Sequence, residues 1–243
     1  MFLIYDTETT GLPLDYNAPL TDFENWPRLV QLAWQIHDEK GKLIEVKNFL
    51  VKPVGFEIPY GSEKIHGIST ERALNEGEDL EFVLSQFNIA LEKIKTISGH
   101  NIEFDNSIMG CEYLRTEIDT PLFEKNIVDT KEVSTNFCAL PGGRGGKYKW
   151  PTLSELHNKL FETGFDEAHN AAADVQATAR CFLELIRIGV IGSSELQTEA
   201  SVVDEFRAIN KSSFEAIGLD IDSFKEEKKD DGTAFEDVDH EME

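Results

Sequence analysis

The stretch MFLIYDTETTG, residues 1–11, opens with apolar and aromatic residues and ends in acidic and small ones. A short apolar run of this kind, bounded by a glycine, is typical of a β-strand in a sheet. Side chains two residues apart in a strand point to the same face, so Asp6 and Glu8 are expected to present their carboxylates together. The sequence therefore predicts a first strand that carries an acidic pair at its carboxyl end.

The residues that follow predict strands first, and then helices that alternate with short strands. Two further strands are expected over residues 28–37 and 42–51, after a polar loop over residues 12–27. Helices are then expected over residues 80–94, 103–114, 152–161 and 170–188, and short strands over residues 96–99 and 126–129. This order predicts an α/β domain with a mixed sheet and helices on both faces.

The domain is expected to span residues 1–191, and residues 192–243 to form an acidic appendage or linker that is partly disordered. From Glu195 to Glu243 there are 16 acidic and 5 basic residues, which is nearly half of the net charge of −23. A weak helix is expected over residues 202–209. This helix carries a short apolar stripe of Val202, Val203, Phe206 and Ile209. The stripe either docks on a partner or packs on the domain itself.

Several classes of protein are disfavoured by composition. No apolar run approaches the roughly 20 residues that span a bilayer, and the first residues lack the basic region of a secretory signal. The chain has three cysteines, which are Cys111, Cys138 and Cys181. They form no CxxC pair, and this disfavours a disulfide framework or a zinc site. A reducing, cytoplasmic location is therefore expected.

The net charge of −23 argues against tight, nonspecific binding to nucleic acid. It is compatible with an enzyme whose metal ions neutralise its carboxylates and whose substrate contact is a short strand end. One basic stretch stands out in this acidic chain: PGGRGGKYKW, residues 141–150. It is either a flexible surface loop or a basic flap that reaches the phosphates of a strand, with Tyr148 and Trp150 available to stack bases.

Two further acidic residues lie close to the ends of predicted strands or the starts of helices. Asp105 begins the helix after the strand at residues 96–99, and Asp174 lies in the first turns of the last long helix. Sites in open α/β sheets gather at the carboxyl ends of strands, so both acids are expected to converge with the pair on the first strand. Oxygen ligands suit two Mg²⁺ or Mn²⁺ ions. His169, five residues before Asp174, is a candidate to accept a proton from an attacking water.

Three motifs, taken in order, resemble those of a known family. They are DTETTG at residues 6–11, NIEFD at residues 101–105 and HNAAAD at residues 169–174. They are similar to the motifs of the DnaQ-like, DEDD-type 3′→5′ exonucleases, in the subclass with a catalytic histidine. The resemblance covers about residues 1–190 and implies a ribonuclease H-like fold, with a mixed central sheet flanked by helices. Its relatives include the proofreading epsilon subunit of bacterial DNA polymerase III.

The resemblance also implies a role for each matching residue. His169 would be the general base, and the acids that would hold two divalent ions, Mg²⁺ or Mn²⁺, are Asp6, Glu8, Asp105 and Asp174. Contacts to the terminal nucleotide would come from Thr9, Leu12, Ile65, His66 and Phe104. Other interpretations stay open, because Thr9 can be a turn residue, Phe104 a core residue and His66 a structural one.

The implied activity is hydrolysis of the terminal phosphodiester of DNA at single-stranded or frayed 3′ ends, as in replication proofreading, with release of nucleoside 5′-monophosphates. The alternatives are RNA 3′-end trimming and a non-catalytic module associated with a polymerase. The implied partners are a single-stranded DNA or RNA 3′ end and, through the C-terminal segment, a DNA polymerase catalytic subunit. It is also open whether the chain is the front part of a longer polypeptide.

Overall fold

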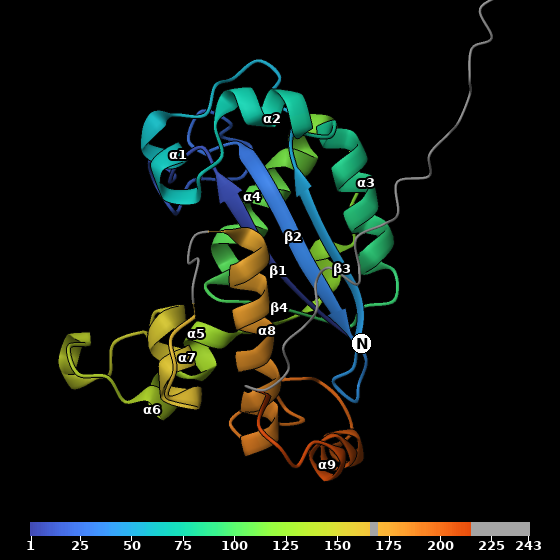
Figure 1. Ribbon diagram of the computed structural model, residues 1–243, viewed down its shortest axis with the longest axis vertical. Coiled ribbons are helices and arrows are strands. Elements are labelled where there is room, and N and C mark those ends of the chain that lie inside the picture. The colour runs from blue at the N-terminus through green and yellow to red at the C-terminus, as the bar shows by residue number, and fades with distance from the viewer. Residues whose placement is uncertain (166–169, 215–243) are drawn as a thin grey trace, which may run out of the picture.

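A single five-stranded sheet forms the centre of the molecule (Figure 1). The structure is a computed structural model that describes residues 1–165 and 170–214. The strand order is β3-β2-β1-β4-β5, with β1 (Phe2–Thr9), β2 (Leu29–His37), β3 (Leu43–Leu50), β4 (Thr96–Gly99) and β5 (Asn126–Asp129). β1, β2 and β3 pair antiparallel, whereas β4 and β5 run parallel to β1. The predicted α/β class with a mixed sheet is thereby confirmed.

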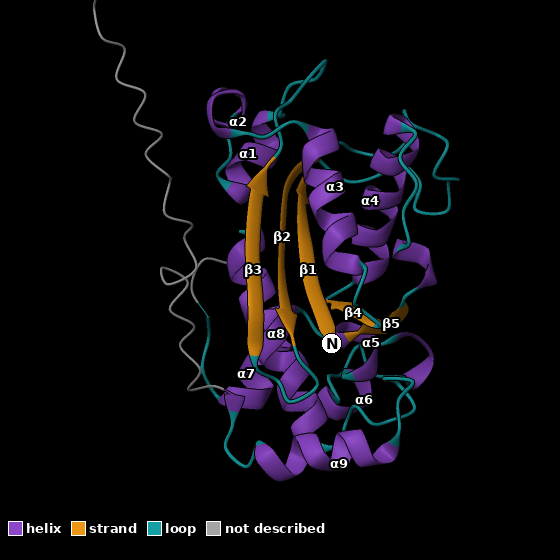
Figure 2. Cartoon of the chain, turned by 90° about the vertical axis from the view of Figure 1, so that its right-hand side faces the viewer, coloured by secondary structure: helices purple, strands orange, loops and turns teal. Residues whose placement is uncertain are grey.

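Helices cover both faces of this sheet (Figure 2). Those before the fifth strand are α1 (Tyr60–His66), α2 (Thr70–Glu76), α3 (Leu80–Leu91), α4 (Ile102–Thr116) and the 3₁₀ turn η1 (Leu122–Glu124). Those after it are α5 (Thr130–Val133), α6 (Thr135–Cys138), the 3₁₀ turn η2 (Arg144–Gly146), α7 (Leu153–Phe161), α8 (Ala171–Ile188) and α9 (Ala200–Ile209). Every helix expected from periodicity is present, and the short α1, α2, α5 and α6 were not expected.

The alternation of side chains along β1 divides the interior into two cores. Leu3 and Tyr5 pack with residues of α3 and α4, such as Phe87, on one face. Phe2 and Ile4 pack with residues of α7 and α8 on the other face. Continuing the same alternation places the side chains of Asp6 and Glu8 on the α8 face, and that of Thr7 on the α4 face.

The segment that follows α8 packs onto the domain through α9. Val203, Phe206 and Phe214 are buried in the same core as α8, and the Arg207 side chain donates hydrogen bonds to the carbonyls of Ile186 and Ile191. Val203 and Phe206 belong to the apolar stripe that was a candidate for docking on a partner, and the structure places them inside instead. The rest of the expected appendage, residues 215–243, lies outside the described residues.

No helix among the described residues is both long and apolar enough to cross a membrane.

Candidate metal centre and active site

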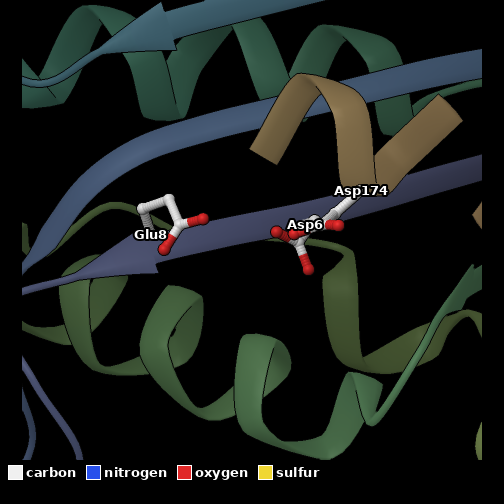
Figure 3. A group of neighbouring side chains, drawn as sticks. All are labelled: Asp6, Glu8 and Asp174. Atoms are coloured by element: carbon white, nitrogen blue, oxygen red, sulfur yellow. The ribbon is translucent and has the colours of Figure 1, made fainter. Parts of the chain in front are cut away.

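Three of the predicted acids meet on the α8 face of the sheet (Figure 3). Asp6 and Glu8 come from β1, and Asp174 comes from the first turn of α8. One carboxylate oxygen from each of the three lies within 4.8 Å of the other two. This separation allows one divalent cation to contact all three groups, since Mg²⁺ and Mn²⁺ bind oxygen at roughly 2 Å.

The two elements that carry these acids are firmly held. β1 is paired along its length with β2 and over its first half with β4, so its backbone cannot shift without breaking both ladders. α8 is anchored at its start by Asn170, whose side-chain oxygen accepts a hydrogen bond from the Ala172 amide at 3.1 Å. Asp174 therefore faces β1 from a capped helix end.

Asp105, the fourth predicted acid, is hydrogen-bonded to Thr7, the residue of β1 between Asp6 and Glu8. Its Oδ1 atom accepts hydrogen bonds from the Thr7 amide at 2.9 Å and from the Thr7 hydroxyl at 2.6 Å. Asp105 is buried in the first turn of α4, beside the group of three rather than within it. The alternation of β1 accounts for this, because Thr7 points toward α4 while its two acidic neighbours point toward α8.

Asp105 is nevertheless coupled to the group by charge. Burial raises the pKa of Asp6 well above its usual range, and the charges of Asp105, Asp174 and Glu8 raise it further. Burial, with Asp174 and Asp105, raises the pKa of Glu8 to about 8. For Asp105, burial raises the pKa to about 7 even though the Thr7 hydrogen bonds oppose the rise. Carboxylates held this close need protons or cations to balance them, and the donor set of oxygens alone fits Mg²⁺ or Mn²⁺.

The predicted base, His169, lies outside the described residues, so its place relative to the acids stays a prediction. The residue after it, Asn170, lies within the described part of the chain and is the N-cap of α8.

The residues predicted to contact the terminal nucleotide fall into two groups. The first group lies around the end of β1 and consists of Thr9, Leu12, Ile65 and His66. Ile65 and His66 belong to α1, which is tied to the turn after Thr9 because the Ser62 hydroxyl donates to the Thr10 carbonyl at 2.8 Å. Leu12 and Ile65 are largely exposed there, with exposed fractions of 71 % and 60 %. Phe104 forms the second group, on α4, and is packed against the core of that face.

The interpretations of Thr9 and His66 as structural residues find support in their hydrogen bonds. The Thr9 hydroxyl donates to the Gly11 carbonyl at 2.6 Å and so shapes the turn. His66 is buried, and its Nδ1 accepts from the Ile68 amide at 3.1 Å. Burial lowers the pKa of His66, and the nearby Thr9 backbone opposes this, while Nε2 has no hydrogen-bond partner among the residues that the structure describes.

Sequence reasoning missed Asp129, at the carboxyl end of β5. Its Oδ1 accepts hydrogen bonds from the amides of Asn101 at 3.0 Å and Lys131 at 2.8 Å, and its charge contributes to the raised pKa of Asp105. Asn101 precedes α4 in a left-handed conformation, with φ of 74°. Asp129 thus fixes the start of the helix that carries Asp105. The signal was available, because Asp129 ends a predicted strand just as Asp6 and Glu8 do.

Comparison with known proteins gives a family and a set of similar folds. The family model described as exonuclease (RNase_T) matches residues 3–182. Among solved structures, E. coli Exonuclease I in complex with a dT13 oligonucleotide has a TM-score of 0.61 at 24 % identity, over 76 % of this chain and 40 % of that one. The zinc-bound form of its complex with single-stranded DNA has a TM-score of 0.60 at 26 % identity, over 77 % and 40 %.

A moderately thermophilic Exonuclease I from Methylocaldum szegediense is also similar, with a TM-score of 0.60, 22 % identity and coverage of 77 % of this chain and 40 % of that one. The chain thus spans about two fifths of the length of these three proteins. Their fold confirms the ribonuclease H-like arrangement that the resemblance implied. No curated protein matches the sequence.

Proposed function

The chain belongs to the RNase_T exonuclease family, and on that premise we propose that it is a metal-dependent 3′→5′ exonuclease acting on single-stranded DNA ends. The observation that carries the proposal is the meeting of one oxygen each from Asp6, Glu8 and Asp174 within 4.8 Å. Such a group has no evident structural use, since mutual repulsion and burial make it unfavourable in the absence of cations.

In this proposal each acid has a distinct task. As the family resemblance implies, Asp6 would contribute to both ion sites, Glu8 and Asp174 would complete the first site, and Asp105 would serve the second from its place beside Thr7. Divalent ions bound there supply an activated water and stabilise the oxygen that leaves a phosphodiester. His169 would accept the proton of the attacking water, and a nucleoside 5′-monophosphate would be released.

The test is hydrolysis of a 5′-labelled single-stranded DNA 20-mer in Mg²⁺ or Mn²⁺, with and without EDTA. We expect EDTA-sensitive shortening from the 3′ end, and a loss of at least about a hundredfold in Asp6→Asn and in Asp174→Asn. Glu81→Gln is the matched control, because it removes an exposed carboxylate of α3. Intact label with both ions, from protein shown to be folded, would contradict the proposal.

DNA is proposed over RNA because similar solved structures are described with DNA oligonucleotides. Rates on DNA and RNA strands of matched sequence decide this, and faster shortening of RNA would favour trimming of RNA ends. The roles in proofreading and in binding a polymerase stay predictions that rest on the family resemblance, and the cytoplasmic location stays a prediction that rests on the cysteine content.

A further inference from the structure

A basic depression lies on the segment between β5 and α7. It has a volume of about 1070 Å³, and its lining includes Thr135, Arg144, Lys147, Tyr148, Lys149 and Trp150. None of the described residues that line it is acidic. In a chain with a net charge of −23, three cations and two aromatic rings around one depression are a local reversal of charge. In Figure 1 the loop that forms it projects beyond α6.

The backbone of this loop has a defined shape. The Lys149 amide donates to the Leu140 carbonyl at 2.9 Å, which closes the base of the loop. A Cβ atom at Gly143 would lie 2.3 Å from the carbonyl oxygens of Lys147 and Tyr148, so only glycine lets the two sides of the loop approach. The depression is therefore a built feature of the fold.

Two of the three cations are available to a ligand. Lys149 forms an ion pair with Glu155 at 2.6 Å. Arg144 and Lys147 are exposed and make no ion pair with any part of the chain that the structure describes. Tyr148 and Trp150 are also exposed, with exposed fractions of 49 % and 62 %. Unpaired cations interleaved with exposed rings are the combination that binds the phosphates and bases of single-stranded nucleic acid.

The depression is tied to the sheet edge at which the candidate site lies. The Lys131 ammonium stands 4.3 Å from the centre of the Trp150 ring, and its Nζ also donates to the Asn101 side chain. His100 Nε2 lies 3.0 Å from the Pro151 carbonyl oxygen, which places Trp150 next to the carboxyl end of β4. Asn101 in turn precedes α4 with Asp105. A continuous chain of contacts thus links the basic loop to the acids.

We infer that Arg144, Lys147 and Trp150 form a binding surface for the single-stranded nucleic acid that lies 5′ of the terminal nucleotide. The inference rests on the proposed function, since it assigns the continuation of the same substrate. The acids can bind the end of the strand only through divalent cations, because both carry negative charge. The basic surface can contact the phosphates directly, because Arg144 and Lys147 are positively charged. It also accounts for how a chain this acidic retains a polyanion during hydrolysis.

Binding without hydrolysis isolates this surface from the catalytic site. Fluorescence anisotropy with a labelled dT20 strand in EDTA is expected to show affinity about tenfold lower for the double variant Arg144→Ala/Lys147→Ala. The slope of log affinity against log salt should fall by about 1.4, which corresponds to two phosphate contacts on a single strand. Lys93→Ala/Lys95→Ala is the matched control, because it removes two exposed cations at the amino end of β4 and should leave both quantities unchanged.

Trp150 supplies an independent signal. The other two tryptophans, Trp26 and Trp34, are buried, with exposed fractions of 4 % and 1 %. Stacking of a base on Trp150 should therefore quench the fluorescence of the native protein. Trp150→Phe should abolish the quenching while it keeps a ring for stacking, and Trp150→Ala should lower affinity by at least about fivefold.

These outcomes separate the surface from the proposed activity. In Mg²⁺ the double variant should hydrolyse thymidine 5′-monophosphate p-nitrophenyl ester at the native rate, because this small diester occupies only the acidic site. If native protein cleaves neither substrate but binds dT20 through Arg144 and Lys147, the proposed activity fails and the surface stands. Unchanged affinity and salt slope in the double variant overturn the surface, as does equal competition by polyglutamate, which would indicate a general site for anions.

Discussion

At the scale of single residues, the candidate site brings together carboxylates whose burial and mutual repulsion destabilise the metal-free fold. Asp6, Glu8 and Asp174 repel one another at short range, and burial disfavours the charged form of each carboxylate of the β1 pair. Bound cations offset this cost. The affinity for metal is therefore balanced against the stability of the metal-free protein, because the same carboxylates raise the first and lower the second.

This balance gives a pH-dependent prediction for Glu8→Gln. The folded pKa of Glu8, about 8, lies above its ordinary value of 4.5, so the folded state binds more protons between these two pH values. The stability of the native protein in EDTA therefore falls as pH rises through that window. Glu8→Gln removes this loss, and its Tm should exceed the native Tm by about 2–4 °C at pH 8 and by little at pH 4.5.

Differential scanning fluorimetry in EDTA at both pH values measures the effect. Glu81→Gln, on the surface of α3, should leave Tm unchanged at each pH. Addition of Mg²⁺ should reverse the order, because only the native site gains the full set of ligands. A lower Tm for Glu8→Gln than for native protein at pH 8 in EDTA would show that Glu8 stabilises the fold.

At the scale of elements, the sequence predicted what depends on local pattern. The helix predicted over residues 152–161 begins with a local signal, a capping box of Thr152 and Glu155 in which the Glu155 amide donates to the Thr152 hydroxyl at 3.2 Å. All five strands were expected, since alternation and flanking turns are local signals. The helices α1 and α2 were missed because each has seven residues, too few to show a period.

What depends on distant partners could not be predicted in this way. The place of Asp105 was inferred from its motif, but its hydrogen bonds to Thr7 depend on which face of β1 each side chain takes. Glu112 drew no attention, although it is fully buried and its Oε1 accepts from Arg28 Nε and from the Leu29 amide, both at 2.9 Å, and lies 3.1 Å from Arg115 Nη1. These partners are brought together only by the fold.

Glu112→Ala should therefore be strongly destabilising. It leaves two partly buried guanidinium groups and the amide at the start of β2 without their acceptor, at a cost of about 3 kcal/mol. The corresponding fall in Tm is about 6–12 °C. Glu103→Ala, an exposed position on the same helix, should cost less than about 0.5 kcal/mol. Urea unfolding followed by circular dichroism compares the two, and equal midpoints would remove Glu112 from the stabilising network.

At the scale of the whole molecule, the described part of the segment after residue 191 is joined to the core of the α8 face. Val203, Phe206 and Phe214 lie inside that core, and the rings of Phe206 and Phe214 stack at 5.9 Å between centroids. The domain boundary expected near Ile191 came from a shift in composition toward acidic residues, which does not report the apolar residues among them. We propose that residues 192–214 belong energetically to the exonuclease domain.

Truncation tests this proposal. A chain of residues 1–191 should have a clearly lower Tm than one of residues 1–214, because it loses these buried rings and exposes the α8 surface beneath them. Phe206→Ala within residues 1–214 should fall between the two, with a cost of about 3 kcal/mol. Ile209→Ala, at an exposed position of α9, should match the longer chain. The same Tm for the two truncated chains would place the boundary at residue 191.

The meeting of β1 and α8 across the sheet has a consequence for the life of the protein in the cell. The acids that meet there are encoded at the two ends of the domain, so no fragment that lacks either end holds the complete set. A nascent chain on the ribosome is without Asp174 until most of the domain has been translated, and a product of proteolysis that has lost α8 is again without it. Fragments that lack β1 or α8 are therefore expected to lack the proposed capacity to degrade nucleic acid.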